Sequence, residues 1–168
     1  MPEDRFTVGV VAIKRKLKSA WVSHAWAPFA VLPAAPAATP WTPLSHEGEN
    51  ETWYVGPAEV VLHHGETGHY RDNLSVERPS LWVALRPTAG EEHEIVSVTA
   101  DPYEGEALAE SADLLVEAVP MPPDILERVA AFFAAHHVER PFFKRKRDRA
   151  GERERGEPGP IDAEGGEP

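Results

Sequence analysis

The amino-acid sequence predicts an α+β fold: a single compact domain with a mainly antiparallel sheet, one long C-terminal amphipathic helix and one short helix. Three observations lead to this expectation. Short β-branched and apolar runs recur between turn signals over the first 120 residues, as they do in antiparallel sheets. Near the C-terminus, one longer stretch repeats apolar residues at helical spacing. The chain has 168 residues, of which 42% are hydrophobic, so it can bury one core.

Seven segments have the composition of strands. In one of them, Leu81, Val83 and Leu85 alternate with Trp82 and Ala84. A strand that is apolar on both faces is expected to be central in a sheet or covered by a helix. The expected strands are 6–13, 20–33, 51–56, 58–64, 80–87, 93–100 and 114–120.

Prolines and glycines set the expected boundaries. Pro28 cannot donate a ladder hydrogen bond, so we expect the second strand to break near it. Gly56 and Pro57 are typical of a turn, which predicts a hairpin between 51–56 and 58–64. The run 33–43 is rich in Pro and Ala and is expected to be an extended surface connection.

Two helices are expected. Asp101 and Pro102 suit the cap and the first position of a short helix. Residues 124–137 predict the longer helix, because apolar residues recur three and four positions apart and form one wide face. We expect the domain to span residues 1–147 and the charged, Gly- and Pro-containing residues 148–168 to form a disordered tail.

Composition excludes several chemistries. The chain has no cysteine, which excludes disulfides, thiolate catalysis and Cys-ligated zinc or iron–sulfur centres. Its net charge is −11, which opposes binding to duplex nucleic acid. No apolar run reaches the roughly 20 residues of a membrane-spanning helix, and the start of the chain lacks the pattern of an export signal. We therefore expect a cytoplasmic protein.

Two histidine clusters are the candidate metal ligands. His63, His64 and His69 form one cluster, and His136 and His137 form the other. Adjacent residues at a strand end point to opposite faces, and the last turn of a helix favours a protonated imidazole for electrostatic reasons. The favoured interpretation is therefore that neither cluster holds a metal. A site formed by His63 or His64 with Glu66 and His69 remains an alternative, and so does a site at His136 and His137.

Further site residues come from one polar stretch. Glu66, Tyr70, Arg71 and Asn73 lie in "ETGHYRDNL", which is interpreted as a loop after a strand and as a candidate polar site. The sequence contains no nucleophile elbow, phosphate-binding loop or dinucleotide fingerprint. We therefore name no catalytic residue and favour a protein that is not an enzyme.

Basic residues gather at two places. The first is a candidate contact with an anion or cofactor, and its residues are Lys14, Arg15, Lys16 and Lys18. The second combines aromatic anchors with cations and is a candidate protein-binding segment; its residues are Phe142, Phe143, Lys144, Arg145, Lys146 and Arg147. Two alternatives remain for the second: attachment to anionic lipid, or phenylalanines that close the domain's own core.

Several strings together resemble domain-of-unknown-function family 3305, a bacterial family without an established activity. They include "VGVVAIKRKLKSAWVSHAWAPFAVLP", "HHGETGHYRDNLS", "VEAVPMPPDI" and "HHVERPFFKRKRDR", and the resemblance covers residues 6–147. It implies genes that lie beside those of respiratory formate dehydrogenases and other molybdenum–iron–sulfur enzymes. Family members are also labelled as guanine dinucleotide attachment proteins for molybdopterin. This chain lacks the Gly-rich loop that such a nucleotidyltransferase carries after its first strand.

The combined expectation is a non-catalytic accessory or assembly protein for a molybdenum-dependent formate dehydrogenase or a related respiratory molybdoenzyme. It would act through protein–protein contacts with an enzyme subunit or a maturation factor, and it would carry no cofactor of its own. Two alternatives remain open. One is a histidine-based metal-binding protein or enzyme, and the other is a binder of the molybdopterin guanine dinucleotide cofactor.

Overall fold

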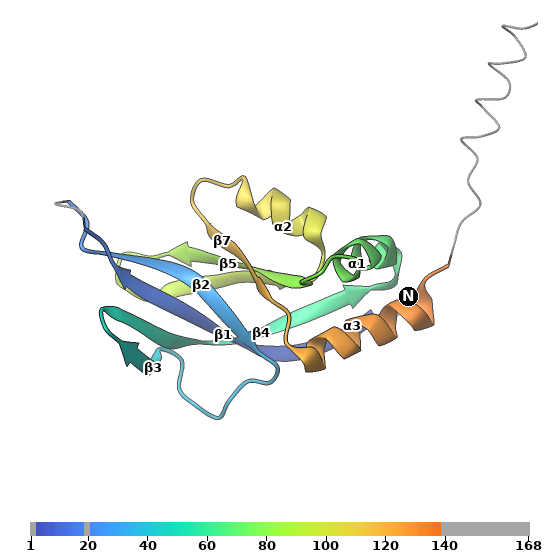
Figure 1. Ribbon diagram of the computed structural model, residues 1–168, viewed down its shortest axis with the longest axis horizontal. Coiled ribbons are helices and arrows are strands. Elements are labelled where there is room, and N and C mark those ends of the chain that lie inside the picture. Colours follow the sequence, from blue (N-terminus) through green and yellow to red (C-terminus); the bar gives the residue numbers. More distant parts are fainter. Residues whose placement is uncertain (1–2, 19–20, 139–168) are drawn as a thin grey trace, which may run out of the picture. The chain divides into compact units, whose positions relative to one another are not determined.

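Figure 1 shows the computed structural model, which describes residues 3–18 and 21–138. Within these residues, two antiparallel sheets and three α-helices confirm the expected α+β fold. The described chain up to His137 forms one compact unit. In chain order the elements are β1 (Glu3–Lys16), β2 (His24–Leu32), β3 (Thr42–Glu47), β4 (Asn50–His63), a 3-10 turn η1 (His64–Glu66), α1 (Thr67–Leu74), β5 (Ser80–Pro87), β6 (His93–Thr99), α2 (Pro102–Ala109), β7 (Leu115–Pro120) and α3 (Pro123–His136).

The larger sheet has the strand order β2-β1-β4-β3. Its long inner strand β1 pairs with β2 and β4. Val8 and Val10 of β1 face the main core, whereas Val11 and Ile13, after a bulge, are buried outside that cluster. Since β1 is apolar on both faces, both faces of the larger sheet must be covered.

The smaller sheet has the order β6-β5-β7 and covers the inner face of the larger one. Strand β2 lies beside β7, and β4 lies beside β6, so the two sheets close around a common core. Leu81, Val83 and Leu85 of the central strand β5 are fully buried in this core. This confirms the prediction that 80–87 is a central strand.

Parts of the Pro- and Ala-rich segment 33–41 pack against strands β1 and β4 of the larger sheet. A Cβ atom on Gly9 would lie 3.1 Å from Pro36 Cδ and 3.1 Å from a ring carbon of Tyr54. The amide of Trp41 donates to the carbonyl of Tyr54 at 2.6 Å. The segment is mostly exposed, as expected of a surface connection, and contacts of Pro36 and Trp41 hold it against the sheet, where the missing side chain of Gly9 makes room for Pro36.

Two predicted strand breaks are wrong. Residues 51–56 and 58–64 are not a hairpin, because β4 runs continuously from Asn50 to His63 and pairs with β1 along its length. Gly56, at φ 148°, absorbs the irregularity in the ladder as a bulge. Strand β2 likewise continues through Pro28, because an edge strand tolerates a missing N–H on its outer side.

The helices differ from the prediction in number. Helix α2 begins as expected, with Asp101 as its cap and Pro102 in its first turn. Helix α3 follows the predicted pattern over 14 residues and buries Ile125, Val129 and Phe132. Helix α1 was not expected, since its residues were interpreted as a loop. No helix among residues 3–18 and 21–138 is long and apolar enough to cross a membrane.

The predicted boundary at residue 147 and the predicted tail 148–168 lie outside the described residues. Both remain predictions.

The contact between α2 and β5 gives a test of the packing. Gly105 faces the indole of Trp82 so closely that a Cβ atom would overlap the ring. We expect Gly105→Ala to lower the free energy of unfolding by about 2 kcal/mol, as overpacking in a filled core does, although alanine favours a helix. Urea unfolding measures this change. Gly90→Ala is the control because nothing lies within 4 Å of its Cβ position, and equal stability of the two variants would contradict the packing.

Candidate functional site

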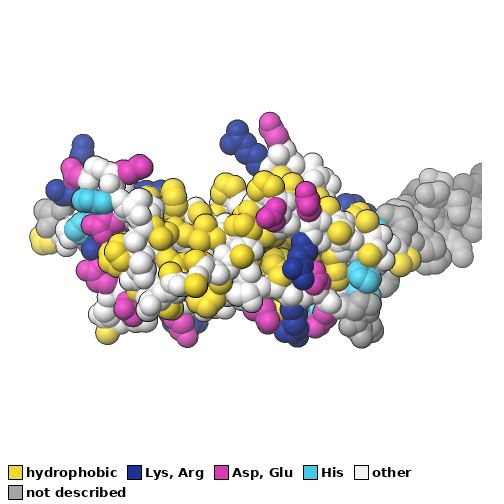
Figure 2. Space-filling model, turned by 90° about the horizontal axis from the view of Figure 1, so that it is seen from below, with side chains coloured by type: hydrophobic (Ala, Val, Ile, Leu, Met, Phe, Trp, Pro, Cys, Tyr) yellow, Lys and Arg dark blue, Asp and Glu magenta, His cyan; other side chains and the backbone are white. Residues whose placement is uncertain are grey.

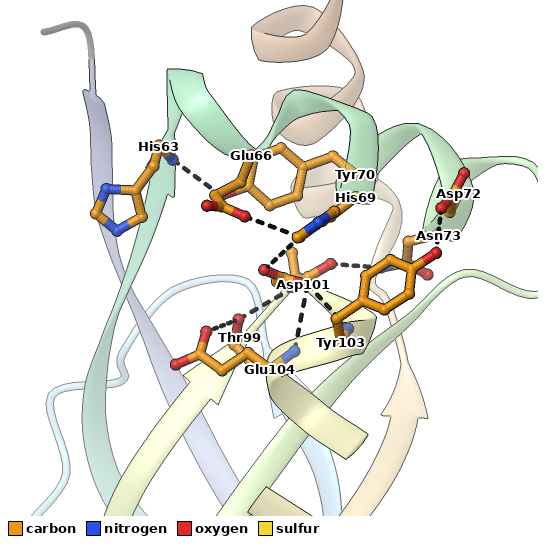
Figure 3. Close-up of polar contacts among 11 residues, drawn as sticks. His63, Glu66, His69, Tyr70, Asp72, Asn73, Thr99, Asp101, Tyr103 and Glu104 are labelled. Atoms are coloured by element: carbon orange, nitrogen blue, oxygen red, sulfur yellow. Dashed lines mark hydrogen bonds and ion pairs between the residues drawn. The ribbon is translucent and has the colours of Figure 1, made fainter. Parts of the chain in front are cut away.

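The candidate site lies where α1 and α2 begin (Figure 3). The imidazole Nδ1 of His69 is 2.8 Å from Oε1 of Glu66 and 2.9 Å from Oδ2 of Asp101. Each of the three residues offers one potential ligand atom, and these atoms lie within 4.8 Å of one another. We call Glu66, His69 and Asp101 the carboxylate–histidine cluster.

Local structure sets the positions of the three side chains. Glu66 directly precedes α1 and its side chain does not cap that helix. It lies three residues before His69, and this spacing places the two side chains on one helix face. Asp101 follows β6 and caps α2, because its Oδ1 accepts from the amides of Tyr103 at 2.9 Å and Glu104 at 3.3 Å. Its second oxygen, Oδ2, is thereby left for His69.

Neighbouring side chains hold the cluster in place. The ring of Tyr103 lies against the imidazole of His69, with 4.4 Å between the ring centroids, and its hydroxyl donates to Asp72 on α1. The amide of Asp101 donates to Thr99 Oγ1 at 3.0 Å. These contacts link α1, α2 and the end of β6 at one point, so the cluster is built on ordered backbone.

Charge is unbalanced in the cluster. The hydrogen bond to Asp101 raises the pKa of His69, and the charges of Asp101, Glu66 and Asp72 add to that shift. Nδ1 carries one hydrogen at most, so two carboxylates compete for a single donor. The side chain of Asp101 is only 12% exposed, whereas those of His69 and Glu66 are 39% and 40% exposed. The cluster therefore opens to solvent on the side of α1.

Two members of the predicted polar site serve the fold instead. Tyr70 is buried, its hydroxyl accepts from the amide of His63 at 2.9 Å, and burial raises its pKa to about 12. Asn73 is buried and binds Ser80 through both backbone groups, at 2.8 and 3.0 Å, and the carbonyl of Ala100 at 2.9 Å. They fasten α1 to the sheets.

The other two members lie on the surface side of α1. Glu66 belongs to the cluster, and the exposed Arg71 has its Nε 3.8 Å from Asp72. Of the four residues named from the sequence, the structure therefore places Glu66 beside His69, and a polar site formed by this stretch stays a prediction.

The remaining histidines of the two sequence clusters lie elsewhere. His63 is 3.2 Å from Glu3 on β1, and His64 lies in η1. His136 packs against the ring of Phe132, and His137 shares a hydrogen bond of 2.9 Å with Thr67 Oγ1. Among the described residues, the structure therefore brings only His69 together with acidic side chains in a metal-compatible group.

The basic residues at the end of β1 are engaged with acids. Lys14 Nζ lies 2.8 Å from Glu91 and above the ring of Trp26, and Lys16 Nζ lies 3.2 Å from Glu49. Arg15 and Lys18 are exposed. The anion site at this end of β1 remains a prediction. The segment Phe142, Phe143, Lys144, Arg145, Lys146 and Arg147 lies outside the described residues.

A second candidate site is the exposed part of an uncharged stretch of chain, which runs from the edge strand β2 to the opposite edge strand β3. Residues 25–45 include no Asp, Glu, Lys, Arg or His, and most residues from 33 to 45 are exposed. Phe29 is 44% exposed and Leu44 is 49% exposed. Figure 2 shows hydrophobic side chains across the middle of the molecule seen from below, with acidic and basic side chains at the ends and also between them. We call the exposed side chains of residues 25–45 the uncharged surface.

An apolar groove adjoins the carboxylate–histidine cluster. It measures about 390 Å³ between α1 and α2, and Val76, Trp82, Pro102 and Tyr103 form its apolar wall. Tyr103 belongs to both features, because its ring also contacts His69. The groove was not expected, since α1 itself was not.

NMR titration tests the electrostatics of the cluster. We expect the imidazole of His69 to titrate above about 6.5, the ordinary value for His, because Asp101 stabilises its protonated form. In Asp101→Asn the midpoint should fall, while α2 keeps its cap because Asn caps helices about as well as Asp. The same midpoint in both proteins would contradict the proposed pairing.

The free energy of unfolding should depend on pH through the protonation of His69. Because folding raises the pKa of His69, its protonation stabilises the fold fully below about pH 6.5, and this contribution is lost as pH rises through the folded pKa. For a partly exposed pair it amounts to less than about 1 kcal/mol. Urea unfolding measures the free energy of unfolding of the natural chain and of His69→Gln. The difference between the two should therefore be larger at low pH than at high pH.

One known protein family matches this chain. No curated protein and no solved structure shows significant similarity to it. The family described as Protein of unknown function (DUF3305) matches residues 7–147. This match covers most of the chain and confirms the resemblance seen in its motifs, and the protein therefore belongs to the DUF3305 family.

Proposed function

We propose that the protein is a non-catalytic accessory or assembly factor that binds another protein through the uncharged surface. The observation that carries this proposal is the absence of charge from 21 consecutive positions, 25–45, in a chain whose average is 27% charged. At that average, 21 positions hold about six charged residues. Interface cores are depleted of charged side chains in this way.

The exposed apolar side chains support the same proposal. Phe29 and Leu44 are each close to half exposed, and aromatic or aliphatic anchors of this kind supply most of the binding energy at interfaces. The segment 33–41 is already packed on the larger sheet. A partner would therefore meet an ordered surface, and little conformational entropy is lost on binding.

Charge favours a different protein over a second copy. The chain carries a net charge of −11, so two copies repel each other. Glu47, Glu49 and Glu51 lie in the β3–β4 hairpin, beside Leu44. An apolar patch with an acidic border suits a partner that has an apolar patch with a basic border.

The finer proposal concerns the identity of the partner. The resemblance to this family implies genes near those of respiratory formate dehydrogenases and their maturation factors. We propose that the partner is a subunit of a molybdenum-dependent formate dehydrogenase or related molybdoenzyme, or one of its maturation factors. Phe142, Phe143 and the four cations 144–147 would then provide a second contact.

Affinity purification from the native organism grown with formate tests this function. With the tagged full-length chain as bait, we expect molybdoenzyme subunits or maturation factors to be enriched. Phe29→Asp combined with Leu44→Asp should reduce their recovery at least about tenfold, because charges buried without partners oppose association. Val76→Asp is the matched control, since Val76 is 53% exposed and lies outside the uncharged surface.

Three results would contradict the proposal. The first is no enrichment of a molybdoenzyme subunit or maturation factor over an untagged strain. The second is equal recovery with the double variant and with the control. The third is a concentration-dependent dimer of the pure chain, seen by light scattering, that the double variant abolishes. Replacing the cations 144–147 by Glu in the full chain separately tests the terminal segment, and unchanged recovery would argue against it.

A further inference from the structure

We propose that the carboxylate–histidine cluster binds one divalent first-row transition-metal ion, such as Zn²⁺ or Mn²⁺. The ligand atoms would be Oε1 of Glu66, Nδ1 of His69 and Oδ2 of Asp101 (Figure 3). This inference is independent of the proposed protein-binding function, because it concerns other residues at another place in the fold.

Two of the distances between the three atoms are slightly shorter than those in a coordination sphere, and the third lies within 4.8 Å. With metal–ligand bonds of about 2.0–2.2 Å, neighbouring ligand atoms lie about 3.0–3.5 Å apart. Nδ1 of His69 lies 2.8 Å from Oε1 of Glu66 and 2.9 Å from Oδ2 of Asp101. Small rotations of the half-exposed side chains of Glu66 and His69 therefore suffice to admit an ion.

Charge balance favours a dication at this position. Two carboxylates with a protonated imidazole leave a net charge of −1, and the one Nδ1 hydrogen cannot bond both oxygens well. A dication with a neutral imidazole brings the same three groups to zero and contacts all three. Asp72 and Glu104 add further negative charge nearby.

The least exposed ligand is oriented in advance. Asp101 has its Oδ1 fixed by the amides of Tyr103 and Glu104, so Oδ2 faces His69 without any rearrangement. Such outer contacts orient the groups that bind a metal and raise its affinity. Glu66 is equally free to bind, since it does not cap α1.

The ligand types select among ions. One imidazole nitrogen with two carboxylate oxygens suits zinc, manganese or iron, whereas Mg²⁺ and Ca²⁺ prefer oxygen ligands alone. The exposed side of the cluster, next to Glu66 and His69, leaves room for water as the remaining ligands. The site therefore resembles an open metal site more than a closed structural one.

Calorimetric titration of the metal-stripped, full-length chain with Zn²⁺ tests the proposal, and electron paramagnetic resonance follows Mn²⁺ binding in the same way. We expect one equivalent to bind. Removing even an outer contact of a metal site typically costs about 10–100-fold in affinity, so His69→Ala and Glu66→Gln should each cost at least that much. Mg²⁺ and Ca²⁺ should bind more weakly than Zn²⁺.

His46→Ala is the matched control. His46 is an exposed histidine that lies 3.9 Å from Glu51, and its loss should leave Zn²⁺ affinity unchanged. Glu66→Gln changes a half-exposed side chain without changing its size, so this variant should fold. It therefore tests the proposal even if His69→Ala fails to fold. Absence of saturable Zn²⁺ binding would overturn the proposal, as would equal affinity in the natural chain and Glu66→Gln, or equal affinity for Zn²⁺ and Ca²⁺.

Discussion

Strand β1 has buried side chains on both of its faces, and this requirement determines what lies on either side of the larger sheet. Val8 and Val10 need the smaller sheet and α3 on the inner side. Val11 and Ile13 lie outside that core and are also buried. Pro36 packs against the outer face at Gly9, where an added Cβ atom would lie 3.1 Å from Pro36 Cδ. The Pro- and Ala-rich segment 33–41 adds no charge, and its exposed side chains form part of the uncharged surface.

The sequence was most informative where one local signal was sufficient. Alternating apolar residues identified β5, and the Asp101–Pro102 pair identified the start of α2. It failed where tertiary contacts outweigh local preference. Gly56 and Pro57 have turn composition, yet β1 pairs with β4 on both sides of them. Helix α1 is short and contains Gly68, and it is held by the buried contacts of its own Tyr70 and Asn73, which no local pattern reveals.

At the candidate site, too, local sequence signals predicted some features, and tertiary contacts determine the others. Glu66 and His69 were named from the sequence as an alternative metal site together with His63 or His64, but the stretch was interpreted as a loop. Asp101 was recognised as a helix cap, which is correct, yet a carboxylate has two oxygens and the second one faces His69. Only the packing of α1 against α2 brings these residues together across 32 positions of sequence. Conversely, Asn73 resembles a site residue in sequence and is a buried structural group.

The central claim is that the uncharged surface is ordered before any partner binds. Trp41 holds this part of the chain in a defined conformation. Its φ is 68°, and its amide donates to the carbonyl of Tyr54 at 2.6 Å. Its ring also packs against Trp26. Hydrogen exchange of the Trp41 amide in the free protein tests it directly. The account predicts exchange as slow as that of strand amides in β4. Exchange as fast as in an unstructured peptide spanning residues 33–45 would contradict it.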